Sequence, residues 1–210
     1  MTYRHFIFDI DGTLLDTEQT GMLSLRQTIK EFTGKELSIP ELLPYFGLPS
    51  AKTSQMLGLA DKARFAEVWE THFQELMYLV TIFPGVENIL QKLKDEKCHL
   101  GIVTSRSKVE FNYDPNLKKI AHFFDCAICS DDTLRHKPFP DPVLEYLKRL
   151  DAQPAECLYL GDTEHDYFCA KSAGIDFALA DWKNRGFQNI PAIFKFSTAA
   201  ELAEKTGITL

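Results

Sequence analysis

The sequence lacks any apolar run long enough to cross a bilayer as a helix, so we expect no membrane-spanning segment. The first strand-like run begins at residue 5, which leaves no room for a signal peptide. Basic residues are also scarce: 23 lysines and arginines stand against 30 acidic residues, for a formal charge of −7. A nucleic-acid backbone demands a basic surface, so this charge argues against nucleic acid as the main partner.

Cysteine is sparse as well, with five residues and no spacing typical of a disulfide framework. This pattern indicates free thiols in a reducing cytoplasm. Cys126 and Cys129 match a C-x-x-C pair, but they lie in a strand-like run, where residues three apart point to opposite faces. We therefore expect two partly buried thiols rather than a redox or zinc pair.

Apolar periodicity predicts an α/β fold for most of the 210 residues. Five short apolar runs predict strands at about 5–10, 98–104, 125–129, 157–161 and 176–180. Two helix faces follow the i, i+3, i+4, i+7 spacing: Val86, Ile89, Leu90 and Leu93, and Val143, Leu144, Leu147 and Leu150. Strands that alternate with helices predict a parallel sheet covered by helices on both faces.

Residues from about 16 to 82 interrupt this alternation with helical patterns and no clear strand. One helical stripe is formed by Phe65, Val68, Trp69, Phe73, Leu76 and Met77. Such a stripe is more typical of packing within a helical bundle than of a cofactor site. A length of 210 residues allows one domain with a sizeable insertion or two small domains. We find no internal repeat and no low-complexity segment.

Two carboxylates, Asp9 and Asp11, stand two residues apart where the first predicted strand ends. Gly12 frees the backbone to turn, and Thr13 adds a hydroxyl. An aspartate can attack phosphorus, and a second carboxyl can exchange a proton with the leaving and attacking oxygens. Holding both beside a phosphate dianion needs a hard cation. The alternative is a turn capped by acidic residues.

Hydroxyls follow a second predicted strand, which ends in Thr104 and Ser105. A hydroxyl at the carboxyl end of a strand can donate to a phosphate oxygen, helped by the amides of the next helix. A simple helix N-cap at Ser105 or Ser107 is the other interpretation.

Lys137 lies in the proline-rich run 136–142, which fixes an extended loop. An ammonium near an attacking aspartate would neutralise both the carboxylate and an incoming phosphate. A solvated surface lysine is the alternative.

Asp162 and Asp166 follow the strand predicted at 157–161, and a helix entered there would bring both carboxylates to one side. Two more acids would complete an oxygen-rich site for magnesium.

In this order and spacing, the four elements resemble the motifs of the haloacid dehalogenase (HAD) superfamily of phosphotransferases. The matching patterns are Asp-x-Asp-Gly-Thr, a strand ending in Thr or Ser, Lys-Pro-x-Pro and Gly-Asp-x-x-x-Asp. The resemblance is weakest over the insertion and after residue 185. It implies a Rossmann-like α/β catalytic core over residues 1–15 and 83–210, with an inserted α-helical cap domain over residues 16–82.

The resemblance also implies a Mg²⁺-dependent phosphatase that forms an aspartyl-phosphate on Asp9. Asp11 would protonate the leaving oxygen and then activate water, and its presence favours phosphoryl transfer over cleavage of carbon–halogen bonds. The phosphate would be bound by Lys137, Gly12 and Thr104, with Ser105 as the neighbouring alternative. The metal ligands would be Asp9, the backbone carbonyl of Asp11, and Asp162, while Asp166 would orient a metal-bound water or Lys137.

Residues 45–50 resemble the loop with which phosphoglycolate-phosphatase-like members face the active site. Gly47 would permit a close approach to substrate, and Lys52 or Thr53 could contact a leaving group; an ordinary turn between helices is the equal alternative. The sequence has no basic cluster for a large polyanion, so we expect a small phosphorylated metabolite. Phosphoglycolate, a sugar phosphate, a nucleoside monophosphate and pyrophosphate all fit, with a monomer or a homodimer as the enzyme.

Two other functions remain open at this point. A phosphomutase of the β-phosphoglucomutase type would share the chemistry but keep the phosphoryl group on Asp9 while the substrate reorients. A non-catalytic regulator would keep the fold and bind a phosphorylated ligand. The intact set of Asp9, Asp11, Lys137 and Asp162 speaks against the regulator, because its three carboxylates repel one another without a metal.

Overall fold

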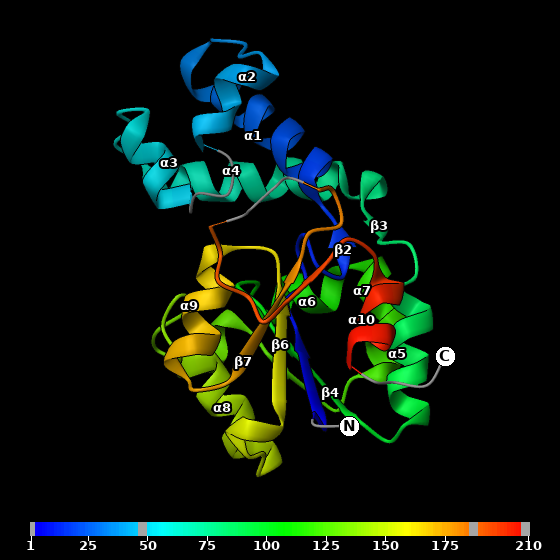
Figure 1. Ribbon diagram of the computed structural model, residues 1–210. Helices are drawn as coiled ribbons and strands as arrows, with labels where there is room; N and C mark the ends of the chain where they lie inside the picture. Colours follow the sequence, from blue (N-terminus) through cyan, green and yellow to red (C-terminus); the bar gives the residue numbers. More distant parts are fainter. Residues whose placement is uncertain (1–2, 46–49, 185–188, 207–210) are drawn as a thin grey trace. The chain divides into compact units, whose positions relative to one another are not determined.

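The computed structural model describes residues 3–45, 50–184 and 189–206. Contacts divide the chain into two compact units (Figure 1). One unit combines Met1–Asp16 with Ile82–Leu210, and the other is Thr17–Thr81. The chain crosses between them at two short strands, β2 (Leu15–Asp16) and β3 (Thr81–Ile82).

The larger unit is built on a six-stranded parallel sheet with the order β5-β4-β1-β6-β7-β8. Its strands are β1 (His5–Phe8), β4 (His99–Val103), β5 (Cys126–Ile128), β6 (Cys157–Gly161), β7 (Asp176–Ala180) and β8 (Phe194–Phe196). The first strand is central: the chain adds β4 and β5 on one side of it and then β6, β7 and β8 on the other. In open α/β sheets, ligands bind where the strand order reverses, so a ligand site is expected at the carboxyl end of β1.

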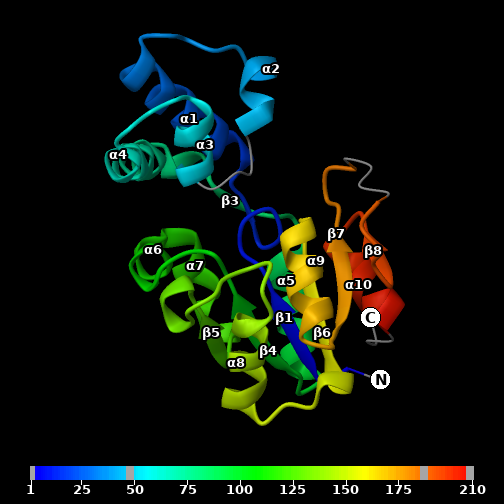
Figure 2. The same cartoon turned by 90° about the vertical axis from the view of Figure 1, so that its left-hand side faces the viewer.

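Helices cover the sheet on both faces, as Figures 1 and 2 show. On one face α8 (Asp141–Leu150) packs against β4 and β5, and α9 (Glu164–Ser172) packs against β6 and β7. On the other, α5 (Val86–Asp95) contacts β4 and α10 (Ala199–Thr206). The shorter helices α6 (Lys108–Tyr113) and α7 (Pro115–Ile120) follow β4 along the chain. Because both faces are covered, the central strands are buried along their whole length and read as continuous apolar runs.

The predicted parallel α/β architecture is confirmed. The face predicted for α8 is wrong in one residue, because Leu144 is 47% exposed and Tyr146 is fully buried in its place. The Tyr146 hydroxyl pairs with Nδ1 of His5, and its ring fits against Gly101, where a side chain would overlap it. Strand β8 was not predicted from the sequence, since it is a three-residue edge strand within an otherwise irregular tail.

The smaller unit contains α1 (Glu18–Thr33), α2 (Ile39–Leu42), α3 (Ser50–Met56) and α4 (Lys62–Glu75). Its core is Met22, Leu25, Ile29, Leu42 and Phe65. The predicted stripe on α4 contributes Phe65 and the partly buried Trp69, whose indole N–H donates to Ser24 Oγ at 3.0 Å. This part of the stripe packs a helical bundle, as predicted, whereas Leu76 and Met77 lie beyond the end of α4. In the described part of the chain, no helix has the length and apolar character of a membrane span.

Candidate active site

The sequence motifs meet at the carboxyl edge of the sheet around β1. The parallel register sets Phe8 opposite Ile102 of β4 and Leu160 of β6. The next residue, Asp9, continues the ladder by donating its N–H to the Leu160 carbonyl at 2.9 Å. Thr104 and Asp162 lie just beyond the ends of β4 and β6, so neighbouring strands deliver residues far apart in sequence to one place.

Lys137 is the centre of this group. Its ammonium donates to Asp9 Oδ1 and to Asp166 Oδ1, each at 2.7 Å. The Lys137 side chain is only 5% exposed, and those of Asp9 and Asp166 are 8% and 0% exposed. The proline-rich loop therefore delivers a buried cation rather than a solvated surface lysine.

Asp166 holds Lys137 in place because both of its own oxygens are engaged. Oδ2 accepts the Thr163 hydroxyl at 2.6 Å and the Thr163 N–H at 3.1 Å in a capping box that starts α9. Oδ1, which accepts from Lys137, also lies 3.1 Å from the hydroxyl of Tyr159. Sequence reasoning did not identify Tyr159, because a tyrosine inside an apolar strand gives no signal beyond core packing.

The protonation of the group follows from its burial and charges. Burial raises the pKa of Asp9 to about 7; Lys137 opposes this, and the carboxylates of Asp166 and Asp11 add to it. Burial alone would lower the pKa of Lys137, but Asp166 and Asp9 raise it above its ordinary value. Lys137 is therefore charged at neutral pH, and this one cation is shared by two buried carboxyl groups.

The donor set fits a hard cation. Carboxylate oxygens of Asp9, Asp162 and Asp166 lie within 4.8 Å of one another, and all three residues are buried. Oxygen ligands of this kind suit Mg²⁺. Of these three residues, Asp166 already accepts hydrogen bonds from Lys137, Tyr159 and Thr163.

Gly12 makes room for Asp162. Its backbone has φ of +81°, and a Cβ built on it would lie 2.1 Å from Asp162 Oδ2. A side chain at this position would displace the carboxylate, so the chain needs glycine both for the turn and for the close approach.

The two hydroxyls after β4 are placed differently. Thr104 is buried, and its Oγ1 accepts the N–H of Arg106 at 3.1 Å, which leaves its hydroxyl proton available to a ligand. Ser105 is exposed, and the N-cap of α6 is Ser107, whose hydroxyl accepts from the Glu110 N–H. Ser107, and not Thr104, therefore caps α6.

Asp11 pairs with Arg106, a residue that sequence reasoning missed. The guanidinium donates to both Asp11 oxygens, from Nε at 2.8 Å and from Nη2 at 2.6 Å. The available signal was a basic residue two positions after the motif threonine at a strand end.

Among the residues expected to face substrate from the insertion, Gly47 lies outside the described residues. Lys52 and Thr53 lie on α3, where Lys52 is exposed and Thr53 is buried.

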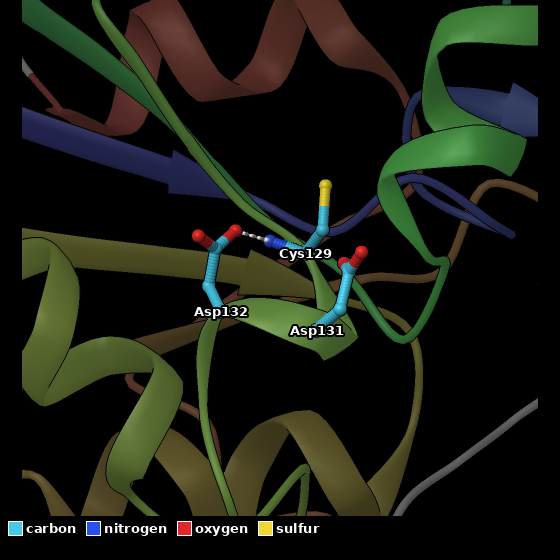
Figure 3. A group of neighbouring side chains, drawn as sticks. All are labelled: Cys129, Asp131 and Asp132. Carbon is cyan, nitrogen blue, oxygen red and sulfur yellow. Dashed lines mark hydrogen bonds between the residues drawn. The ribbon is translucent and has the colours of Figure 1, made fainter.

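A second group of possible metal ligands, Cys129, Asp131 and Asp132, is explained by charge pairing. Asp132 accepts the Cys129 N–H at 2.9 Å, as Figure 3 shows, and its Oδ1 lies 2.9 Å from both Lys108 and Arg149. Burial raises the pKa of Cys129 to about 11 and keeps the thiol protonated. All five cysteines are free thiols. Cys126 is partly buried, as expected, whereas Cys129 lies just past the end of β5 and is buried.

Comparison with known proteins identifies the class. The model of the haloacid dehalogenase-like hydrolase family matches residues 6–180. Pyrophosphatase PpaX of Bacillus velezensis is 30% identical over 206 residues, covering 96% of this chain and 95% of the relative. Pyrophosphatase PpaX of Oceanobacillus iheyensis is 31% identical over 183 residues, covering 87% of this chain and 85% of the relative.

A solved structure agrees over the whole chain. A Lactobacillus plantarum protein provisionally assigned as a phosphoglycolate phosphatase superposes with a TM-score of 0.88 at 26% identity, over 97% of this chain and 99% of its own. The chain therefore belongs to the haloacid dehalogenase-like hydrolase family, and it is an enzyme of the phosphatase type. The resemblance read from the motifs is confirmed.

Proposed function

We propose that the protein is a Mg²⁺-dependent phosphatase that hydrolyses a small phosphorylated metabolite through an aspartyl-phosphate on Asp9. The observation that carries this proposal is the buried Lys137, whose ammonium lies 2.7 Å from both Asp9 and Asp166. A fixed cation beside the attacking carboxylate lowers the repulsion that an approaching phosphate dianion would meet. The two carboxylates in turn hold the Lys137 ammonium in a buried position, away from solvent.

In the first step the carboxylate of Asp9 attacks phosphorus, and the bond to the leaving oxygen breaks. Asp11 gives its proton to that oxygen. In the second step a water attacks phosphorus, Asp11 takes its proton, and the phosphoryl bond to Asp9 breaks to release phosphate. Lys137 and the Thr104 hydroxyl bind the phosphoryl oxygens while their charge redistributes. Ser105 and the backbone at Gly12 are further candidates for phosphate contacts.

We assign Mg²⁺ to Asp9, Asp162 and the backbone carbonyl of Asp11. When bound, the ion would polarise the phosphoryl group and offset the charge of the carboxylates. The three buried carboxyl groups whose oxygens lie within 4.8 Å of one another support this assignment.

Pyrophosphate and phosphoglycolate are the substrates that we would test first. Relatives that cover nearly the whole chain are named pyrophosphatases. The solved structure from Lactobacillus plantarum is provisionally assigned as a phosphoglycolate phosphatase. We further propose that the helical unit Thr17–Thr81 acts as the cap that selects the substrate. The free thiols at all five cysteines support work in the reducing cytoplasm.

The proposal is tested by phosphate release from a panel of pyrophosphate, phosphoglycolate, sugar phosphates and nucleoside monophosphates, with Mg²⁺ or with EDTA. We expect one compound to be preferred and the activity to be lost in EDTA and restored by excess Mg²⁺. Full activity in EDTA would contradict the metal assignment. Isomerised sugar phosphate without net phosphate release would indicate a mutase, and metal-independent binding without turnover would indicate a regulator.

Gly12→Ala tests the metal site from the backbone. Because the added methyl group overlaps Asp162, we expect the Mg²⁺ concentration for half-maximal activity to rise about 10-fold or more. The matched control is Gly34→Ala, which has a similar φ of +70° but no atom within 4 Å of the new Cβ. It should cost about 1 kcal/mol of stability and leave the Mg²⁺ requirement unchanged. Equal effects in the two variants would contradict the prediction.

A further inference from the structure

Arg106 is a buried cation next to the proposed active site, and the four motifs do not include it. It lies two residues after Thr104, and its side chain is 9% exposed. Three of its nitrogen atoms donate to carboxylates: Nε and Nη2 to Asp11, and Nη1 to Asp114 Oδ2 at 2.7 Å. The guanidinium is thus held between two acids that lie 103 positions apart in the sequence.

Asp114 anchors the far side of this arrangement. It is fully buried, and its Oδ1 accepts the N–H groups of Asn116 and Leu117 at the start of α7. One oxygen therefore caps a helix while the other fixes Arg106. The helix cap and the ion pair leave Arg106 little freedom to turn.

The contact with Asp11 is a fork in which two parallel N–H groups meet two carboxylate oxygens. Such a pair fixes both the position and the plane of the carboxylate, which a lysine cannot do. The Asp11 side chain remains 41% exposed and accessible to a ligand.

We propose that Arg106 is a positioning residue that sets the carboxylate of Asp11 for proton exchange, with Asp114 as its anchor. The proposal rests on the proposed function, because it gives Asp11 the role of acid and base. A purely structural ion pair is the alternative. Buried ion pairs often contribute little net stability compared with apolar residues of the same size, so stability alone gives a weak reason for this arrangement.

The test compares kcat/KM for two substrates whose leaving groups differ in their need for a proton. Phenolate needs a proton more than p-nitrophenolate does, so an error in placing Asp11 should slow phenyl phosphate more than p-nitrophenyl phosphate. For Arg106→Ala we expect kcat/KM to fall about 100-fold with phenyl phosphate and about 10-fold with p-nitrophenyl phosphate. Arg106→Lys keeps the charge but not the fork, and it should remain slow. The N–H that reaches Thr104 is present in both variants.

A double-mutant cycle with Asp11→Ala separates positioning from folding. If Arg106 acts through Asp11, then Arg106→Ala should change kcat/KM less than about threefold in the Asp11→Ala background. The control is Arg149→Ala, which removes ion pairs to Glu145 and Asp132 at 2.8 and 2.9 Å from a more exposed arginine of the same unit. It should leave both substrates unaffected.

Three results would overturn the inference. The first is a double variant in which the kcat/KM losses of the two single variants multiply. The others are equal losses with both substrates, or full activity in Arg106→Lys. If Arg106→Ala does not fold, Asp114→Asn takes its place, since the asparagine oxygen can still cap α7 while the pair to Arg106 is lost. It should show the same dependence on leaving group with a smaller loss. A wild-type protein inactive on every phosphoester would refute the proposed function itself. If the wild type is active but the losses of the two single variants multiply in the double variant, only the role of Arg106 is refuted.

Discussion

Asp9→Asn should abolish turnover, with a loss of about 10⁴-fold or more, because no other group can form the phosphoryl-enzyme. The phosphoryl group should be found by mass spectrometry on the peptide that contains Asp9 in acid-quenched wild type and be missing in the variant. The exposed Asp95 on α5 provides the control, and Asp95→Asn should keep full activity. More than a few per cent of wild-type activity in Asp9→Asn would refute Asp9 as the nucleophile.

The same variant should fold at least as well as the wild type in metal-free buffer. Burial and the nearby carboxylates raise the pKa of Asp9 to about 7, so its ionised form destabilises the fold increasingly as the pH rises from about 4 toward 7. Asparagine carries no charge and can still accept from Lys137. Thermal unfolding should be measured above the Asp9 pKa of about 7, where the carboxylate is ionised. This measurement separates lost chemistry from lost structure. A much lower melting temperature would mean that Asp9 has mainly a structural role.

Lys137→Met should lose both stability and activity. It leaves the carboxylates of Asp9 and Asp166 buried without their shared cation, which should cost about 3–5 kcal/mol in the free energy of unfolding. Phosphate release should fall about 10³-fold, since the cation beside the reacting phosphoryl group is gone. Urea unfolding in metal-free buffer and initial rates in saturating Mg²⁺ measure the two effects.

Two variants show whether these effects of Lys137 are specific. Lys94→Met removes a surface pair with Asp125, at 2.8 Å but with both side chains about one-third exposed, and should cost less than about 1 kcal/mol. Lys137→Met combined with Asp166→Asn should regain part of the stability, because one buried charge is removed, but not the activity. Recovery of activity in the double variant would contradict a direct role for Lys137 at the phosphate.

Local patterns in the sequence predicted much of the fold. Apolar runs located β1, β4, β5, β6 and β7 to within about two residues, because strands buried on both faces need continuous apolar side chains. The error at Leu144 has a specific cause. Leucine spacing favoured that residue for the buried face of α8, whereas packing buries Tyr146 against Gly101, a fit between residues 45 positions apart.

The candidate site divides in a similar way. Asp9, Thr104, Lys137, Asp162 and Asp166 could be selected from the sequence because each lies beside a strand end or in a loop with a recognisable pattern. Arg106 and Tyr159 were missed, since their partners are set by side chains that come from other strands and helices. A pattern within one segment has no information about a guanidinium that reaches a carboxylate 95 positions away.

The sequence by itself thus determined which residue types stand at the ends of the strands, and with them the family. Only the tertiary structure decided which of these residues meet. The order β5-β4-β1-β6-β7-β8 and its parallel register bring Lys137 to Asp9 across 128 positions and set Arg106 between Asp11 and Asp114. Strand formation depends on short-range periodicity, whereas a distance of 2.7 Å between charged groups depends on how every strand pairs and every helix packs.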